Sequence, residues 1–175
     1  MVRPITAALV CVALAGALAG CADNNPPAGQ PSFYRSLAHA DAELDVNAAQ
    51  SMISGYRTNN GLGPVTIDPE LMRLAREQAR AMAARDKLDH AVARPFDERI
   101  KNSGFDASVA VENVSAGYDT LADAFAGWRD SPAHRANMLN GHVTRMGIAA
   151  VYTPQSKYKV YWALILAAPD DQHRG

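Results

Sequence analysis

The fold of this chain is decided near its C-terminus, by the runs MGIAAVY (residues 146–152) and YKVYWALIL (residues 158–166). Both contain β-branched and aromatic residues, which favour strands. The five residues between them, 153–157, include a proline and are typical of a hairpin loop. We therefore expect an antiparallel pair of strands to close the chain.

The segments before these strands have the spacing of amphipathic helices. Apolar residues recur at helical intervals over residues 41–60. They recur again after Asp68, which we expect to cap a helix that has Pro69 in its first position. Further helices are expected over about residues 95–102 and from about residue 120, the latter capped by Asp119 or Thr120. A chain with helices in its first part and an antiparallel pair of strands at its end is predicted to form an α+β domain whose sheet is covered by helices.

Three side chains with metal-binding or acid–base chemistry are expected beside these elements. His90 follows the helix that starts at Pro69, and Glu112 comes at the end of a short buried strand expected over residues 109–111. His134 falls in the first turn of a helix for which Ser131 is a natural cap. Two imidazoles and one carboxylate are the minimum set for holding a divalent metal or polarising a small ligand.

The position of His134 favours its neutral form, because the positive end of a helix dipole disfavours an imidazolium. A neutral imidazole is what zinc or another divalent metal requires, and two histidines with one carboxylate leave positions open for water or a ligand. A purely structural role is the alternative. His90 would then end its helix by bonding a carbonyl, and His134 would bond Glu112.

The first 20 residues are expected to be a secretion signal. Arg3 supplies a positive charge, residues 5–18 are apolar, and small residues lead to Cys21. This pattern resembles the bacterial lipoprotein signal, in which the cysteine is acylated and the chain is cut just before it. Residues 21–40, polar and rich in proline, would form a lipidated, flexible tether, and residues 41–170 a single domain.

Composition excludes one class of partner. The formal net charge is -1, charged residues make up 20% of the chain, and no block of lysine and arginine is present to neutralise phosphates. Nucleic acid is therefore not expected as a partner. With one cysteine left after the signal, no disulfide is expected either, and the domain should be a monomer stabilised by its core.

Several motifs, in the same order, resemble the bacterial branch of the CAP superfamily, named after cysteine-rich secretory proteins, antigen five and plant pathogenesis-related proteins and also known for its SCP-like extracellular domain. The motifs are LDH (88–90), Phe96 to Ile100 with GF (104–105), ENVSAG (112–117), FAGW (125–128), SPAHRANMLN (131–140), TRMGIA (144–149) and YW (161–162). The resemblance covers residues 46–166. It implies an α-β-α sandwich, with a central antiparallel sheet of three or four strands between helical layers and a cleft on one side.

The resemblance also implies a set of cleft residues. Many members carry two histidines and two acidic residues there, and the matching positions are His90, Glu112 and His134. The second acid does not carry over, because Glu112 is the last glutamate of the chain. Its place would be taken by Asp130, by Ser131 or by nothing. His142 also sits in a motif-like run, but it lies too close to residues 146–147, so we choose His134 and keep His142 as the second choice.

Two functions remain open at this point. The first is a membrane-tethered extracytoplasmic binding module without enzymatic activity, whose cleft takes a small molecule, a lipid, an envelope ligand or a divalent metal. The second is a hydrolase of peptides or cell-envelope polymer. The sequence lacks a Gly-x-Ser-x-Gly elbow and a His-Glu-x-x-His helix, which favours binding. The catalytic candidates would be His90, Glu112, Ser131 and His134, and the supporting residues Asn113, Asp130, Ser131 and Arg135.

Overall fold

A computed structural model describes residues 29–170 of the 175-residue chain. The expected signal (residues 1–20) and Cys21 lie outside the described residues. Within residues 29–170, no helix has both the length and the apolar character needed to cross a membrane.

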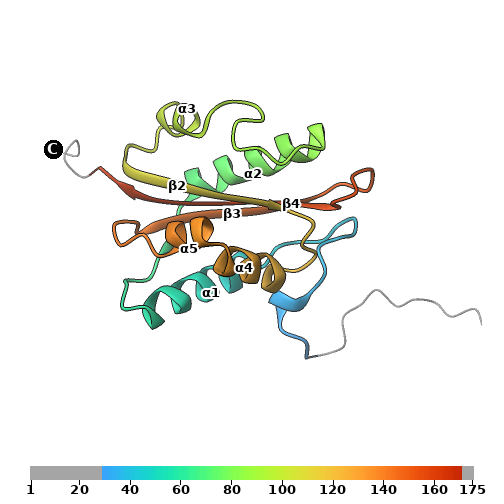
Figure 1. Ribbon diagram of the computed structural model, residues 1–175, viewed down its shortest axis with the longest axis horizontal. Helices are drawn as coiled ribbons and strands as arrows, with labels where there is room; N and C mark the ends of the chain where they lie inside the picture. The colour runs from blue at the N-terminus through green and yellow to red at the C-terminus, as the bar shows by residue number, and fades with distance from the viewer. Residues whose placement is uncertain (1–28, 171–175) are drawn as a thin grey trace, which may run out of the picture.

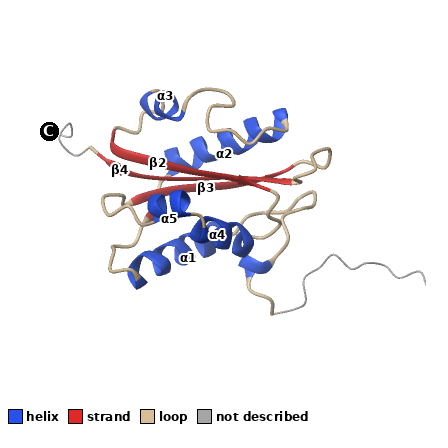
Figure 2. Ribbon diagram, viewed as in Figure 1, coloured by secondary structure: helices blue, strands red, loops and turns tan. Residues whose placement is uncertain are grey.

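The described chain forms three layers, with a sheet between two layers of helices (Figures 1 and 2). Two helices cover one face of the sheet and three cover the other, which confirms the expected α-β-α sandwich. The first face carries α2 (Pro69–Arg85) and α3 (Phe96–Lys101), and the second α1 (Val46–Asn59), α4 (Leu121–Asp130) and α5 (Pro132–Met138), preceded by a short 3-10 turn at Ser32–Tyr34.

The sheet has the order β1-β3-β4-β2, with β1 (Thr66–Ile67), β2 (Ala107–Ala116), β3 (Arg145–Tyr152) and β4 (Val160–Pro169). The expected closing hairpin is confirmed, because β3 and β4 pair antiparallel. Strand β2 pairs antiparallel with the other side of β4, while the two-residue β1 runs parallel to β3. Strand β4 is therefore central, and β2 lies at the edge of the sheet.

Polar side chains begin the helices where the sequence predicts them. Asp68 accepts hydrogen bonds from the first turn of α2, and Thr120 accepts one from the first turn of α4. Helix α1 begins at Val46, later than expected, because Asp45 caps it. Asp41, the expected start, has a φ of 62°, which is left-handed and outside any α-helix.

Strand β2 is longer than predicted, and Glu112 does not end it. It runs from residue 107 to 116, with Glu112 paired to Ile165 in its middle. The prediction used only the apolar residues 109–111 and so made the strand too short. Polar residues can continue an edge strand, because their side chains can bond to the helices on either face of the sheet. The expectation of a strand end at Glu112 was wrong for this reason.

Helix α2 packs closely on the sheet through a glycine. A Cβ atom built on Gly147 of β3 would overlap the backbone of Leu71 in α2. Only a residue without a side chain allows this approach. The backbone of β3 and the first turns of α2 are thereby brought together, and α2 in turn positions the loop that carries His90.

The packed domain begins earlier than residue 41. Phe33 packs against the main core, and Leu37 is buried within it. The Leu37 amide donates to the Asp119 carbonyl at 2.6 Å, and the Ser32 hydroxyl donates to the Asp45 carboxylate at 2.6 Å. Residues 32–40 were expected to belong to the tether, but Leu37 is in the core and Phe33 and Ala38 pack against it.

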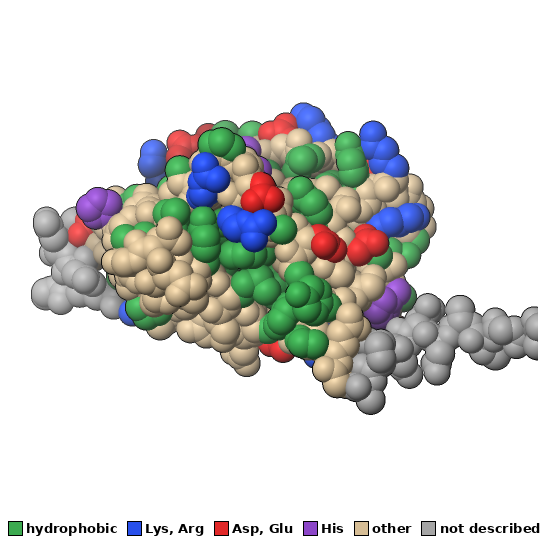
Figure 3. Space-filling view, turned by 60° about the horizontal axis from the view of Figure 1, so that its bottom comes forward, with side chains coloured by type: hydrophobic (Ala, Val, Ile, Leu, Met, Phe, Trp, Pro, Cys, Tyr) green, Lys and Arg blue, Asp and Glu red, His purple; other side chains and the backbone are tan. Residues whose placement is uncertain are grey.

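Charges of both signs are interspersed on the surface beneath the α1 and α4 layer. The space-filling view of this face shows basic and acidic side chains lying among apolar ones (Figure 3). This mixture agrees with the net charge of -1 and gives this face no dominant sign of charge.

Candidate functional site

The site is built around two neighbouring residues of the edge strand. Glu112 and Asn113 follow each other in β2, so their side chains point to opposite faces of the sheet. Glu112 meets the layer of α2 and α3, and Asn113 meets α5. His90 and His134 come from these two layers. The His90–Glu112–His134 site, as we call it, therefore straddles the edge of the sheet.

The carboxylate of Glu112 is buried and fully engaged. Its side chain is 1% exposed. Its Oε1 atom accepts from His90 Nδ1 at 2.9 Å and from Arg99 Nη2 at 2.9 Å, and its Oε2 atom accepts from Arg99 Nη2 at 2.7 Å. A buried carboxylate needs such a counter-charge, because an unpaired charge in the interior is strongly destabilising.

Arg99 is the functional-site residue that the sequence analysis missed. It lies on α3 with 8% of its side chain exposed, and its guanidinium also donates to the His90 carbonyl at 3.1 Å. It further stacks over the Phe96 ring, 5.2 Å from the centroid. The signal that would have found it is a basic residue in the short helix facing a strand that carries a buried glutamate.

His90 is the accessible member of the site. It lies in the loop after α2 with 54% of its side chain exposed. Gln78 holds this loop, since its amide nitrogen donates to the Asp89 carbonyl at 2.7 Å. The hydrogen bond to Glu112 raises the pKa of His90 above its ordinary value, an effect that burial only partly opposes.

His134 has the opposite protonation preference. Burial lowers the pKa of His134, and the positive charge on His90 lowers it further. The direction is the one expected from the sequence, but burial, and not the helix dipole, is its main cause. The two imidazoles lie close enough to influence each other, and the site combines one that tends to keep its proton with one that tends to lose it.

Two asparagines fix the helix that carries His134. Asn113 donates from Nδ2 to the His134 carbonyl at 3.0 Å. Asn137 donates to the Glu112 carbonyl at 3.1 Å and to Asn113 Oδ1 at 2.9 Å. The first turn of α5 is thus bonded to the middle of β2. Asn113 therefore holds α5 against β2.

The remaining candidates lie at the junction of α4 and α5. Arg135 donates to the Arg129 carbonyl at 3.1 Å and so links the two helices. Asp130 forms an ion pair with Arg129 at 2.9 Å, and its side chain is 67% exposed. Ser131 occupies the cap position of α5 without a side-chain capping bond. Among the described residues, no hydrogen bond connects Asp130 or Ser131 to Glu112 or to either imidazole ring.

Arg99 and His90 compete with a metal ion for Glu112. Its Oε1 atom accepts two hydrogen bonds and its Oε2 atom one, so most lone pairs of the carboxylate are already used. Across residues 29–170, no group of three or more histidine, cysteine, aspartate or glutamate side chains is placed to hold a metal ion. Zinc binding by His90, Glu112 and His134 stays a prediction for a titration to test.

Comparison with known proteins identifies the family. Residues 50–166 match the CAP family, described as the cysteine-rich secretory protein family. The chain belongs to the CAP family. It is 29% identical over 138 residues to the uncharacterized protein YkwD of Bacillus subtilis, an alignment that covers 71% of this chain and 53% of YkwD. The chain therefore spans about half the length of this CAP relative.

Solved structures show the same CAP fold. An outer surface protein of Borrelia burgdorferi superimposes with a TM-score of 0.66 at 19% identity, over 72% of this chain and 93% of that one. An extracellular protein containing an SCP domain from Bacillus anthracis gives a TM-score of 0.61 at 19% identity, over 69% of this chain and 39% of that one. At this level of identity the likeness establishes the fold.

Proposed function

We propose that this CAP domain is a membrane-tethered, extracytoplasmic binding module without enzymatic activity. Its His90–Glu112–His134 site would take a small polar ligand of the cell envelope. The observation that carries the proposal is the double engagement of Glu112 by Arg99, at 2.9 and 2.7 Å. A carboxylate held in this way orients His90 and is not free to activate water as a general base.

The two imidazoles suit recognition of a polar ligand. His90 is exposed, and its raised pKa favours a positively charged donor on the surface. His134, with its lowered pKa, offers a neutral ring that can accept or donate. A ligand with an acidic or carbonyl oxygen beside a hydroxyl or amide group would be complementary to this pair.

A hydrolase is the alternative function, and one contact favours it. His90 bonds Glu112 through Nδ1, which leaves Nε2 as the ring nitrogen available for proton transfer. In that mechanism Ser131 or a water molecule would act as the nucleophile. Against it, Arg99 offsets the charge of Glu112, and no hydrogen bond in the described part of the chain joins Ser131 to His90.

The extracytoplasmic location and the lipid anchor are parts of the proposal. They are supported by the signal-like residues 1–20 before Cys21 and by the similar proteins, which are described as an outer surface protein and an extracellular protein. Cys21→Ala should move the protein from the membrane fraction to the soluble envelope fraction. Unchanged membrane retention would refute the anchor.

The function is tested by calorimetry and thermal shift on residues 22–175, which contain the whole described fold. The probes are a muropeptide mixture, phosphatidylglycerol vesicles, magnesium chloride and zinc chloride. We expect a muropeptide-dependent rise in melting temperature that disappears in His90→Gln and His134→Gln. His142→Gln, a change on an exposed loop, is the matched control.

Three results would change the conclusion. A zinc-dependent rise that requires both His90 and His134 would replace the envelope ligand with a metal. A rise with vesicles alone would replace it with a lipid. Turnover of a peptide or peptidoglycan library that is abolished by His90→Ala would establish the hydrolase.

A further inference from the structure

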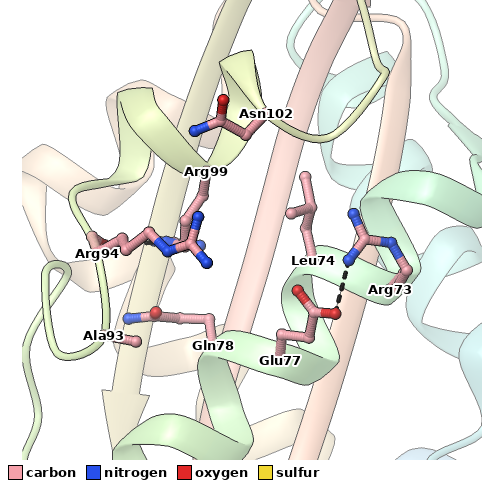
Figure 4. Close-up of a pocket in the computed structure, with 8 residues that line it drawn as sticks. All are labelled: Arg73, Leu74, Glu77, Gln78, Ala93, Arg94, Arg99 and Asn102. Carbon is pink, nitrogen blue, oxygen red and sulfur yellow. Dashed lines mark hydrogen bonds and ion pairs between the residues drawn. The ribbon is translucent and has the colours of Figure 1, made fainter.

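A polar pocket lies between α2 and α3, and Arg99, the partner of Glu112, lines it. It has a volume of about 300 Å³. Figure 4 shows side chains from α2, among them Gln78 and Glu77, meeting Arg99 and Asn102 from the α3 region around this space. The volume is at the lower end of those that hold small molecules.

Gln78 brings an unpaired acceptor to the pocket. The residue is 1% exposed, and its Nε2 atom donates to the carbonyls of Asp89 and His90, at 2.7 and 3.4 Å. Because carbonyl oxygens only accept, these bonds fix which end of the amide faces the loop. The Oε1 atom is buried and has no hydrogen-bond partner.

Arg99 brings an unpaired donor. Its Nη2 atom is used by Glu112, and its Nε atom donates to the Arg94 carbonyl at 3.3 Å. The Nη1 atom is buried and has no partner, on a side chain that is only 8% exposed. Two residues that line the pocket thus each carry a buried polar atom without a partner among the described residues, and such atoms are almost always satisfied by something.

Arg94 brings a cation that has no ion pair in the described part of the chain. Arg73 pairs with Glu70 as well as with Glu77, the latter at 2.6 Å and drawn as a dashed line in Figure 4, and Glu112 offsets the charge of Arg99. The guanidinium of Arg94 is exposed and lines the same pocket, and within residues 29–170 it has no ion pair. An anionic group would give Arg94 and Arg99 Nη1 the acceptor that neither has within the described fold.

We propose that the pocket between α2 and α3 binds a carboxylate that carries a neighbouring hydroxyl group, as in a sugar acid. The carboxylate accepts from Arg99 Nη1 and from Arg94, and the hydroxyl donates to Gln78 Oε1. Asn102 at the rim supplies a further amide to a second hydroxyl. This site is separate from the one that carries the proposed function, and the two share Arg99 as their common wall.

Calorimetry on residues 22–175 with sodium glucuronate tests the proposal. Glucose has the hydroxyls without the carboxylate, propionate has the carboxylate without hydroxyls, and inorganic phosphate is an anion of different shape. We expect glucuronate to bind at least tenfold more tightly than each of the other three. Arg94→Gln, a change of an exposed side chain, should weaken glucuronate binding about tenfold, by loss of one charge-assisted contact. Arg85→Gln, on an exposed position of α2 outside the pocket, is the matched control and should bind as the unaltered chain does.

Several outcomes would overturn the proposal. Absence of a response to glucuronate would mean that water alone satisfies Gln78 and Arg99. If glucose bound as tightly as glucuronate, the carboxylate would have no role in binding. If propionate or phosphate bound as tightly as glucuronate, the hydroxyl would have none. Unaltered glucuronate binding by Arg94→Gln would place the ligand elsewhere. Because the other site is tested by changes at His90 and His134, the two proposals fail independently.

Discussion

His90 and His134 have opposite protonation preferences although they belong to one site. The difference comes from their partners. His90 has a carboxylate at 2.9 Å, which stabilises its charged form, whereas His134 is half-buried beside the positive charge of His90. Each preference links folding stability to pH, with opposite signs. A raised pKa means that protonation of His90 stabilises the fold, and a lowered pKa means that protonation of His134 destabilises it.

The pH dependence of stability should separate the two imidazoles. The stabilisation from His90 is fully present below its ordinary pKa of 6.5 and is lost as the pH rises through its raised pKa. For His134, stability increases as the pH rises from its lowered pKa to 6.5. Urea unfolding between about pH 5 and about pH 8 measures both effects. Compared with the unaltered chain, His90→Gln should lose less stability as the pH rises, and His134→Gln should lose less stability as the pH falls.

Titration by NMR gives an independent check. The ring signals of His90 should have their titration midpoint above pH 6.5, and those of His134 below pH 6.5. The signals of each histidine are assigned from their disappearance in the variant that lacks it. Coincident titration of the two rings would contradict the electrostatic description of the site.

Helix α5 owes its position to a residue on another helix. Arg57 of α1 is 1% exposed and donates to the carbonyls of Met138 and Asn140, both at 2.8 Å, and of Val143 at 3.0 Å. Its Nε atom donates to the Gly63 carbonyl at 2.9 Å. The last carbonyls of a helix have no partner within the helix, so the guanidinium closes the end of α5 and the loop that follows.

Replacing this guanidinium should destabilise the domain. Arg57→Lys keeps the charge but loses the planar fork, and it would leave two or three buried carbonyls without donors. We expect the free energy of unfolding to fall by about 3 kcal/mol, measured by urea unfolding. Arg76→Lys, on the exposed face of α2, should change it by less than about 0.5 kcal/mol. A similar stability for both variants would contradict the role of Arg57.

At the scale of the whole molecule, the N-terminal segment completes the layer formed by α1, α4 and α5. Leu37 is buried, and Phe33 packs against the same core cluster as Trp128. The hydrogen bond from the Leu37 amide to the Asp119 carbonyl fixes this segment beside the start of α4. Residues 32–40 are therefore part of the domain, on the face of the sheet opposite α2.

Removal of this segment should be measurable. A chain that starts at residue 41 should be less stable than one that starts at residue 29 by about 3 kcal/mol, because it exposes the core surface that one buried leucine and one half-buried phenylalanine cover. Thermal unfolding of the two chains checks this, with Leu37→Ala in the longer chain as the matched single change. Equal melting temperatures would show that the segment only rests on the surface.

Local signals in the sequence determined the type and order of the elements. The caps at Asp68 and Thr120 and the strands over residues 145–152 and 160–169 follow from residues next to each other, and so they could be predicted. The motifs around His90, Glu112 and His134 selected these residues as the candidate site, and their role in binding stays a prediction.

The tertiary structure alone decided which partner each of these residues meets. Arg99 and Glu112 are separated by 13 residues, and Arg57 and Val143 by 86, so neither pairing leaves a local pattern. These contacts depend on the edge position of β2 and on the packing of two helical layers around it. They give Glu112, a buried carboxylate, a guanidinium that offsets its charge, because an interior charge requires a partner that only the folded chain can bring to it.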